Sequence, residues 1–296
     1  MRLNYSNFRF KAVVDFVEIE IRTVRPSNGG AIKRNAKIAY AEAIEVGAGG
    51  AASIFRIKLY DLANHTGLLD EIERIEKLFP FTIPATITAL EVAFDGYRKL
   101  TDENPATRHD LIVLAARLSF MLANPASVNR RVYHKYKGSG SAMPKTLDSM
   151  IEFIGKGYNV AVGNNGNCVN DPISQHGYFA DHDRGNYIED ESEHSARSEV
   201  RIVGNIGSLA GFQFQSLAKH LYCRTEAGAL PNHSPQLREL ILKAQGSNLF
   251  SRKNSKRVAT SKGGQGGTSK KFSTPADRKL NAIIYAKLRE LSIKWA

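Results

Sequence analysis

The chain has 296 residues, enough for one large domain or two small ones with a buried core. Hydrophobic residues make up 42% of it and charged residues 24%, values that exclude a largely disordered chain. The formal net charge of +12 favours a polyanionic partner, either nucleic acid or an anionic membrane surface.

Targeting and cross-linking signals are missing from the sequence. No apolar run reaches the roughly 18 residues of a membrane-spanning helix, and the N-terminus lacks the apolar block of a signal peptide. Cys168 and Cys223 lie far apart and form no CxxC motif, which argues against a disulfide framework and a cysteine zinc site. A cytoplasmic protein is therefore expected.

The first elements are two strands and a connecting turn. "VEIEIR" (17–22) and "FRIKLYD" (55–61) alternate apolar and polar residues, which predicts half-buried strands. The glycine-rich "EVGAGGAAS" (45–53) lies between them. It lacks both the GxGxxG spacing and the downstream acid of a dinucleotide site, so a plain turn is favoured over a phosphate loop.

Helices and a strand follow in alternation. "GLLDEIERIEKLF" (67–79) has a helical apolar face, and "TITALEVAFD" (86–95) is typical of a strand. Residues 107–125 are predicted to form a helix, with Thr107 as its N-cap and Asp110 three residues on.

The second half repeats this mixture without a fixed period. Residues 144–157 are predicted to be a helix, 158–164 and 196–204 strands, and 208–222 and 234–244 helices. Since the order is not a regular βαβ repeat, an α+β fold is expected, with a central mixed or antiparallel sheet flanked by helices.

Three segments are expected along the chain: a folded domain over 1–250, a flexible basic linker over 251–273, and a C-terminal helix over 274–296. The linker is rich in glycine and in cations but holds no acid. It is either a solubilising spacer or an arm that neutralises phosphates, and four of its cations are candidate nucleic-acid contacts: Arg252, Lys253, Lys256 and Arg257.

One segment, residues 175–204, is dense in acids although the chain is basic. Its carboxylates are Asp181, Asp183, Glu189, Asp190, Glu191, Glu193 and Glu199. The spacing of its three histidines matches no zinc pattern. Most of the acids over 181–193 are expected to belong to a solvated loop.

Acids inside predicted strands are more informative. Glu91 and Asp95 fall on one face of the strand at 86–95. Glu199 is flanked on its own face by Arg197 and Arg201, which are two further candidate nucleic-acid contacts. A carboxylate in an apolar strand needs a salt bridge or a cation. Taken alone, such an acid favours a salt bridge to Lys or Arg over a cation. Several acids together would suit Mg²⁺ or Mn²⁺, which prefer oxygen ligands.

Two tyrosines lie among polar groups near basic residues, Tyr178 in "HGYFADHD" and Tyr133 in "RRVYHKYKG", where Lys135 completes a Tyr-x-Lys pattern. A tyrosine can attack a phosphodiester and hold the product covalently. Taken singly, each tyrosine is better explained as a surface or core ring with a hydrogen-bonded hydroxyl group.

The order of four motifs, "ITALEVAFD", "GYNVAVGN", "GYFADHD" and "HSARSEVRI", resembles the replication initiation proteins of filamentous phages and of rolling-circle plasmids of the staphylococcal transfer type. The likeness covers most of residues 12–225. It implies an enzyme that nicks one strand at an origin, keeps a 5′-phosphotyrosyl link and frees a 3′-OH primer.

The resemblance also implies roles for particular residues. Tyr178 matches the nucleophile, and Glu91, Asp95 and Glu199 match the acids that bind Mg²⁺ or Mn²⁺. The implied partner is origin DNA, single-stranded or in a hairpin; a host helicase and a second copy of the chain are further expected partners, and a membrane is not.

The chain departs from the family pattern at three positions. Ala180 stands in place of a lysine, Leu90 in place of an arginine, and position 91 is Glu rather than Asp. These departures keep open two alternatives: Tyr133 as the nucleophile, and a DNA-binding protein of the same fold that does not cleave.

Overall fold

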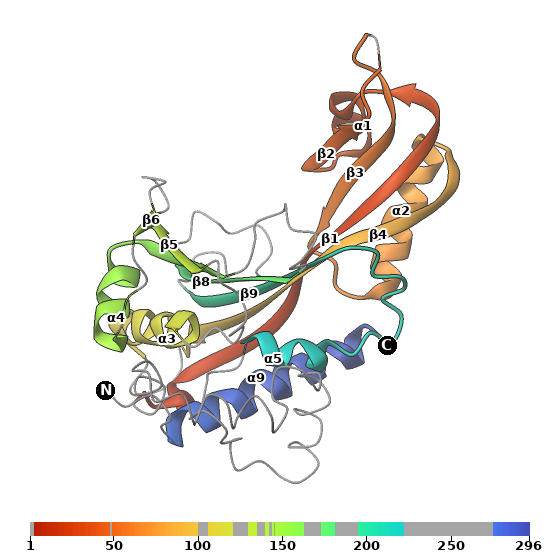
Figure 1. Cartoon of the computed structure of the whole chain (residues 1–296). Helices are drawn as coiled ribbons and strands as arrows, with labels where there is room; N and C mark the ends of the chain where they lie inside the picture. The colour runs from red at the N-terminus through yellow and green to blue at the C-terminus, as the bar shows by residue number, and fades with distance from the viewer. Residues whose placement is uncertain are drawn as a thin grey trace, which may run out of the picture. The chain divides into compact units, whose positions relative to one another are not determined.

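A computed structural model describes residues 3–47, 49–99, 106–120, 130–134, 140–141, 144, 146–162, 173–180, 195–221 and 275–296 (Figure 1). The described strands form a nine-stranded sheet in the order β2-β3-β1-β4-β9-β8-β7-β5-β6. Helices, including one at the C-terminus, accompany the sheet, and the expected α+β fold is confirmed.

The strands are β1 (Phe8–Ser27), β2 (Tyr40–Ile44), β3 (Ala52–Tyr60), β4 (Phe81–Arg98), β5 (Arg130–His134), β6 (Gly140–Ser141), β7 (Tyr158–Val162), β8 (Ile173–Ala180) and β9 (Ser195–Val203). The helices are η1 (Tyr5–Asn7), α1 (Gly29–Ala36), α2 (His65–Leu78), α3 (Arg108–Phe120), α4 (Leu147–Gly155), η3 (Phe214–Leu217), α5 (Ala218–Leu221) and α9 (Pro275–Lys294). The chain divides into two compact units, and their boundary cuts through the strands β1, β4 and β9.

One unit comprises residues 13–92, 201–212 and 293–296. Here β3 pairs antiparallel with both β1 and β2, so that Ile19 of β1 lies opposite Ile57 of β3. Both isoleucines are fully buried, as are Ile32 of α1 and Ile75 of α2. The period-two pattern of the sequence therefore places one face of β1 in a core that the two helices complete.

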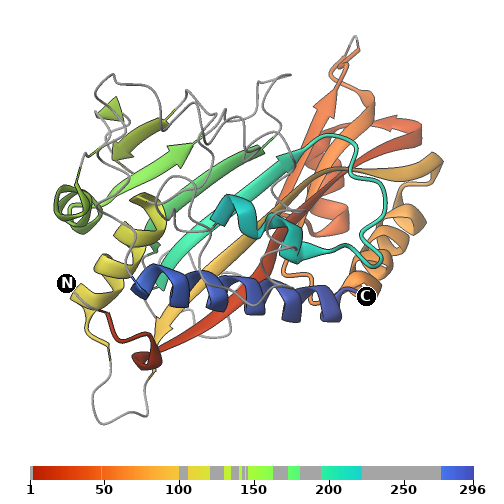
Figure 2. The ribbon, with the colours of Figure 1, turned by 60° about the horizontal axis from the view of Figure 1, so that its bottom comes forward.

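The other unit comprises residues 1–12, 93–200 and 213–292. Its strand β7 pairs antiparallel with β5 and with β8, and α3 and α4 pack against this part of the sheet (Figure 2). The rings of Phe10 and Phe94 stack with centroids 5.5 Å apart. Gly96 lies close to these rings. A Cβ at this position would lie 3.1 Å from Phe10 Cε1 and only 2.5 Å from Leu114 Cδ2, so a larger side chain would not fit without a shift.

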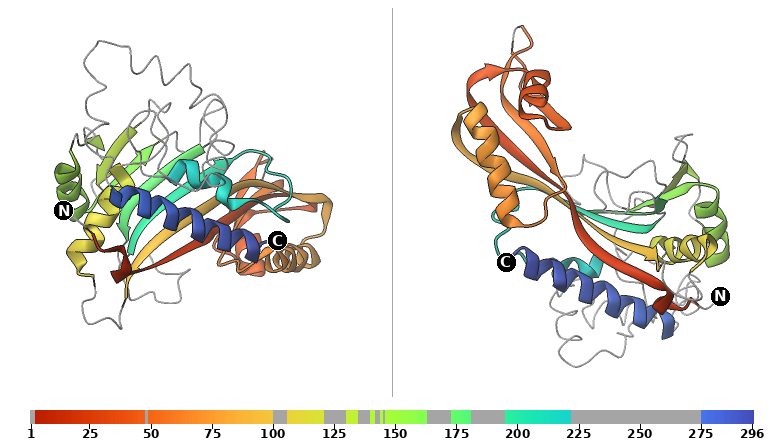
Figure 3. Two further views of the ribbon diagram at one scale, coloured as in Figure 1. Left: turned by 90° about the horizontal axis from the view of Figure 1, so that it is seen from below. Right: turned by 180° about the vertical axis from the view of Figure 1, so that it is seen from behind.

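The C-terminal helix α9 belongs mainly to this second unit. Leu280, Ile284 and Leu288 recur every four residues along it and are fully buried. Ser292 near its end hydrogen-bonds to Gln215 of η3, and Figure 3 shows α9 running beside the short helix α5. No helix in the described part of the chain is long and apolar enough to cross a membrane.

Local sequence signals account for several helix boundaries. The Thr107 hydroxyl accepts a hydrogen bond from the Asp110 backbone N–H, and the Asp110 carboxylate accepts one from the Thr107 N–H, which confirms the expected cap of α3. Thr146 and Ser149 cap α4 in the same reciprocal way.

Other boundaries differ from the sequence expectations. The strands β1 and β4 are longer than the predicted segments at 17–22 and 86–95. Pairing with neighbouring strands extends each strand beyond the residues that alternate strictly. The segment expected as a helix over 208–222 holds only η3 and α5 within its described part. Residues 234–244 and the linker over 251–273 lie outside the described residues.

Candidate functional site

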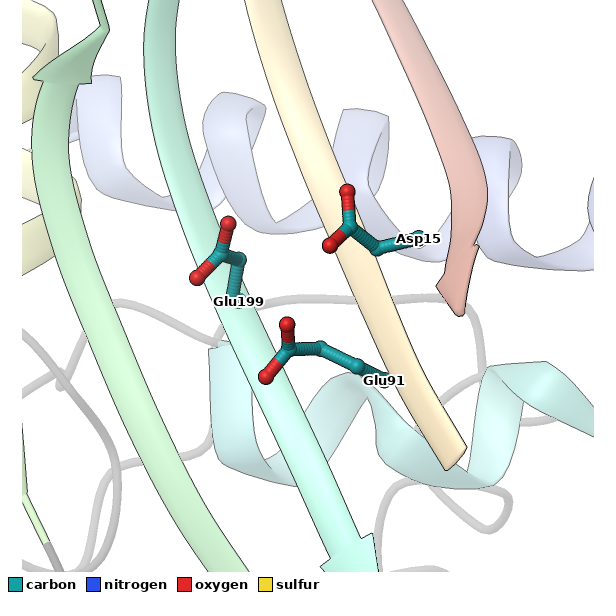
Figure 4. A group of neighbouring side chains, drawn as sticks. All are labelled: Asp15, Glu91 and Glu199. Atoms are coloured by element: carbon teal, nitrogen blue, oxygen red, sulfur yellow. The ribbon is translucent and has the colours of Figure 1, made fainter. Parts of the chain in front are cut away.

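Three buried carboxylates converge on one point from three strands. Asp15 comes from β1, Glu91 from β4 and Glu199 from β9, and their carboxylate groups point toward one another (Figure 4). One oxygen of each lies within 4.8 Å of the others, and the residues are only 5%, 4% and 6% exposed. We call this group the acidic cluster.

The register of the sheet brings these acids together. The Thr88 hydroxyl donates to Glu18 and so joins β4 to β1, while the Gly204 N–H donates to the Thr88 carbonyl and joins β9 to β4. Since β1, β4 and β9 are neighbours in the sheet, acids placed within their apolar runs meet across the strands.

Two arginines of β9 approach the acids of β4 and β9. Arg201 Nε lies 2.6 Å from Glu91 Oε2. Arg197 binds Asp95 with two hydrogen bonds of 2.7 and 2.9 Å, and its Nη1 lies 3.5 Å from Glu199 Oε1. Planar two-point binding of this kind fixes the guanidinium and, through it, the nearby Glu199.

Burial and nearby charges shift the pKa values of three groups around the acidic cluster and Asp95. Burial, and then the charges of Asp15 and Glu91, raise the pKa of Tyr60, which keeps this phenol protonated. Burial, and then the charge of Asp95, likewise raise the pKa of Tyr97. Burial, and then Arg201, lower the pKa of Lys58, while Glu91 works in the opposite direction.

The composition of the acidic cluster suits a hard divalent cation. Three carboxylates meeting in a buried place repel one another, and a bound cation offsets both that repulsion and the cost of burial. Carboxylate oxygens are the ligands that Mg²⁺ and Mn²⁺ prefer, and one oxygen of each acid lies within 4.8 Å of the others, so the donor set suits these cations. Arg201 beside Glu91 and Arg197 beside Glu199 offset part of the same repulsion.

Two of the three predicted metal ligands lie in the acidic cluster, and the third lies outside it. The structure brings Glu91 and Glu199 together, while Asp95, which is fully buried, is held by Arg197 instead. The third acid of the cluster is Asp15, which the sequence reasoning missed. It carries the same signal as the other two, because it lies within the apolar run "AVVDFV" of β1.

The two predicted DNA contacts on β9, Arg197 and Arg201, differ in exposure. Arg197 is 3% exposed and lies next to two carboxylates, those of Asp95 and Glu199. The side chain of Arg201 is 28% exposed. The remaining predicted contacts, which lie in the linker, and Lys135 are outside the described residues.

The two candidate nucleophiles lie on different strands. Tyr178 is on β8, which neighbours β9 in the sheet. Tyr133 is on β5, opposite Asn159 of β7, and both β7 and β8 separate β5 from β9. The strand order therefore puts Tyr178 on the strand next to that of Glu199.

Comparisons with known proteins do not assign the chain to a family. A scan against protein-family models gave no match, and a search of curated proteins gave none either.

Proposed function

We propose that this protein is a replication initiator of a phage, prophage or plasmid that nicks one DNA strand and acts in the cytoplasm of a bacterial host. The observation that carries the proposal is the convergence of Asp15, Glu91 and Glu199 in a basic chain. Acids that would repel DNA are tolerated where a cation screens them, while basic groups elsewhere hold the strand.

In the proposed reaction the phenol oxygen of Tyr178 attacks a backbone phosphorus atom. The bond from phosphorus to the 3′ oxygen breaks, and the phenol proton ends on that oxygen as a 3′-hydroxyl group. The 5′-phosphate stays on the tyrosine. Mg²⁺ or Mn²⁺ held by the acidic cluster would neutralise charge that develops on the phosphoryl oxygens.

Covalent capture tests the proposal and needs no known origin. Full-length protein is incubated with Mn²⁺ and a randomised single-stranded DNA library, and adducts that survive denaturation are isolated and sequenced. We expect an adduct whose formation requires Mn²⁺ and which Tyr178→Phe abolishes. Tyr285→Phe on α9 is the matched control, because Tyr285 lies outside the acidic cluster and outside the motifs that carry the resemblance.

Other outcomes of the capture experiment count against the assignment. An adduct that persists in Tyr178→Phe but is lost in Tyr133→Phe moves the nucleophile to β5. Absence of any adduct, together with salt-sensitive DNA binding, favours the second candidate, a DNA-binding protein that does not cleave. Ala180 supports that candidate, because no lysine stands two residues after Tyr178 to assist at the phosphate.

Metal binding by the acidic cluster is tested separately by thermal unfolding. Mn²⁺ is expected to raise the melting temperature of the wild-type protein, because a ligand bound only by the folded state stabilises it. Asp15→Asn is expected to abolish that rise while leaving a folded protein, whereas Glu71→Gln on α2 should retain it. An equal rise in the wild type and in Asp15→Asn would contradict a cation at this site.

A further inference from the structure

Two cations pack on a single aromatic ring beside the acidic cluster. Lys58 Nζ lies 4.5 Å from the centroid of the Phe16 ring, and Arg201 Cζ lies 4.9 Å from it. Phe16 is only 3% exposed. Cation–π contacts of this kind restrict where each charge can sit.

The surrounding aromatic rings extend this arrangement. The ring of Tyr60 lies 5.8 Å from that of Phe16, and Lys58 Nζ also lies 4.8 Å from the ring of Tyr40. Tyr40, Lys58 and Tyr60 are half-exposed, and the side chain of Arg201 keeps 28% exposure. Both cations are therefore ordered by aromatic rings and still reach solvent.

The local electrostatics favour an anionic ligand here. Burial, and then the positive charge of Arg201, lower the pKa of Lys58, as expected for two cations that approach one ring. Glu91 holds Arg201 at 2.6 Å, and Glu18 and Glu91 offset part of the repulsion on Lys58. An anion that contacts both cations would offset the remaining repulsion between Lys58 and Arg201.

We propose that Lys58 and Arg201 bind the phosphate backbone of single-stranded DNA next to the acidic cluster. The inference rests on the proposed function and deepens it by naming the strand contact of the same site. Grooves that bind single strands combine cations for the phosphates with aromatic rings, and here these groups lie together on strands β1, β2, β3 and β9. Both cations lie within 4.9 Å of the centroid of the same Phe16 ring.

The test measures binding without cleavage. Full-length protein is titrated into a fluorescein-labelled oligothymidylate in EDTA, and anisotropy is followed over a series of KCl concentrations. We expect Lys58→Ala and Arg201→Ala each to weaken binding about five- to tenfold at low salt. Each should also lower the slope of log K against log salt by about 0.7, the value for one phosphate contact on a single strand.

Matched variants separate charge from fold. Lys77→Ala removes an exposed lysine of α2 that pairs with Glu73, and it should leave both affinity and salt slope unchanged. Arg201→Lys keeps the positive charge beside Glu91 and should retain most of the salt slope. It replaces Arg201→Ala in the comparison if that variant does not fold. Lys58→Arg should restore the slope lost in Lys58→Ala.

The outcomes distinguish this inference from the nicking proposal. A salt slope in Lys58→Ala equal to that of Lys77→Ala overturns the inference, even if the tyrosine adduct forms. A lowered slope with no adduct from any variant supports the inference and removes the nickase. Binding of inorganic phosphate alone is measured by calorimetry. If Lys58→Ala and Arg201→Ala lose phosphate binding but keep the wild-type affinity and salt slope for the oligonucleotide, the pair is a site for free phosphate and the DNA assignment is overturned.

Discussion

At the scale of single residues, the most constrained feature is the contact between Arg197 and Asp95. Both side chains are almost fully buried, at 3% and 1% exposure, and they share two short hydrogen bonds. A buried ion pair of this kind adds little net stability compared with apolar residues, but removing one partner leaves a charge in a poor solvent. Its evident role is to hold Arg197 where its Nη1 faces Glu199.

Asp95→Ala should therefore lower the free energy of unfolding by about 3–5 kcal/mol, because it leaves the guanidinium of Arg197 buried without its two-point acceptor. Chemical denaturation followed by circular dichroism measures the change. Adding Arg197→Met in the same chain should recover part of the loss, since the buried charge is then gone.

The comparison for this variant is Glu152→Ala, which breaks the exposed pair between Glu152 and Lys156 on α4. Exposed pairs contribute little, so this variant should unfold almost as the wild type does. Equal stabilities for Asp95→Ala and Glu152→Ala would show that the buried pair is not formed in solution.

At the scale of elements, strand β4 is the one on which the site depends. It carries Glu91 and Asp95, and it lies between β1 and β9 in the sheet. Near its end, a Cβ at Gly96 would lie 2.5 Å from Leu114 Cδ2 of α3 and 3.1 Å from Phe10 Cε1. The packing of α3 on this strand therefore requires glycine.

Gly96→Ala is expected to destabilise the protein by about 1–3 kcal/mol, because the added methyl group overpacks a filled core. The measurement is again denaturant unfolding. Gly67→Ala on α2 is the control, since a Cβ there would meet its nearest atom at 3.5 Å and alanine favours helices. If both substitutions stabilise the protein, the close approach of α3 to β4 is wrong.

Much of the element order was predictable from the sequence, and the reasons are local. Alternation revealed the cores of β1, β3 and β4, and the cap of α3 followed from Thr107 and Asp110. The helix α1 and the strands β2 and β5 were missed, because short segments with mixed polarity carry little periodic signal.

At the scale of the whole molecule, the C-terminal helix is part of a folded unit. A helix was expected over 274–296, and α9 spans Pro275–Lys294. Up to Ser292 it belongs to the same compact unit as residues 93–200. The buried residues Leu280, Ile284 and Leu288 give this helix a packing role. Removing it would expose an apolar stripe.

Ile284→Ala should lower the unfolding free energy by about 2–5 kcal/mol, because it opens a cavity at a fully buried position. Ile293 on the same helix is 71% exposed, so Ile293→Ala should change the free energy of unfolding by less than about 0.5 kcal/mol. Thermal and denaturant unfolding of the two variants tests the orientation of α9. Equal losses would contradict it.

The sequence by itself determined the basic character of the chain, the mixture of helices and strands, and the presence of carboxylates inside apolar strands, because charge and periodicity are properties of neighbours along the chain. Only the tertiary structure decided which acids meet. Asp15 lies far from Glu91 and Glu199 in the sequence, and the order β1-β4-β9 brings the three together while Arg197 holds Asp95. Strand order and register depend on long-range pairing and on burial, which no local pattern encodes.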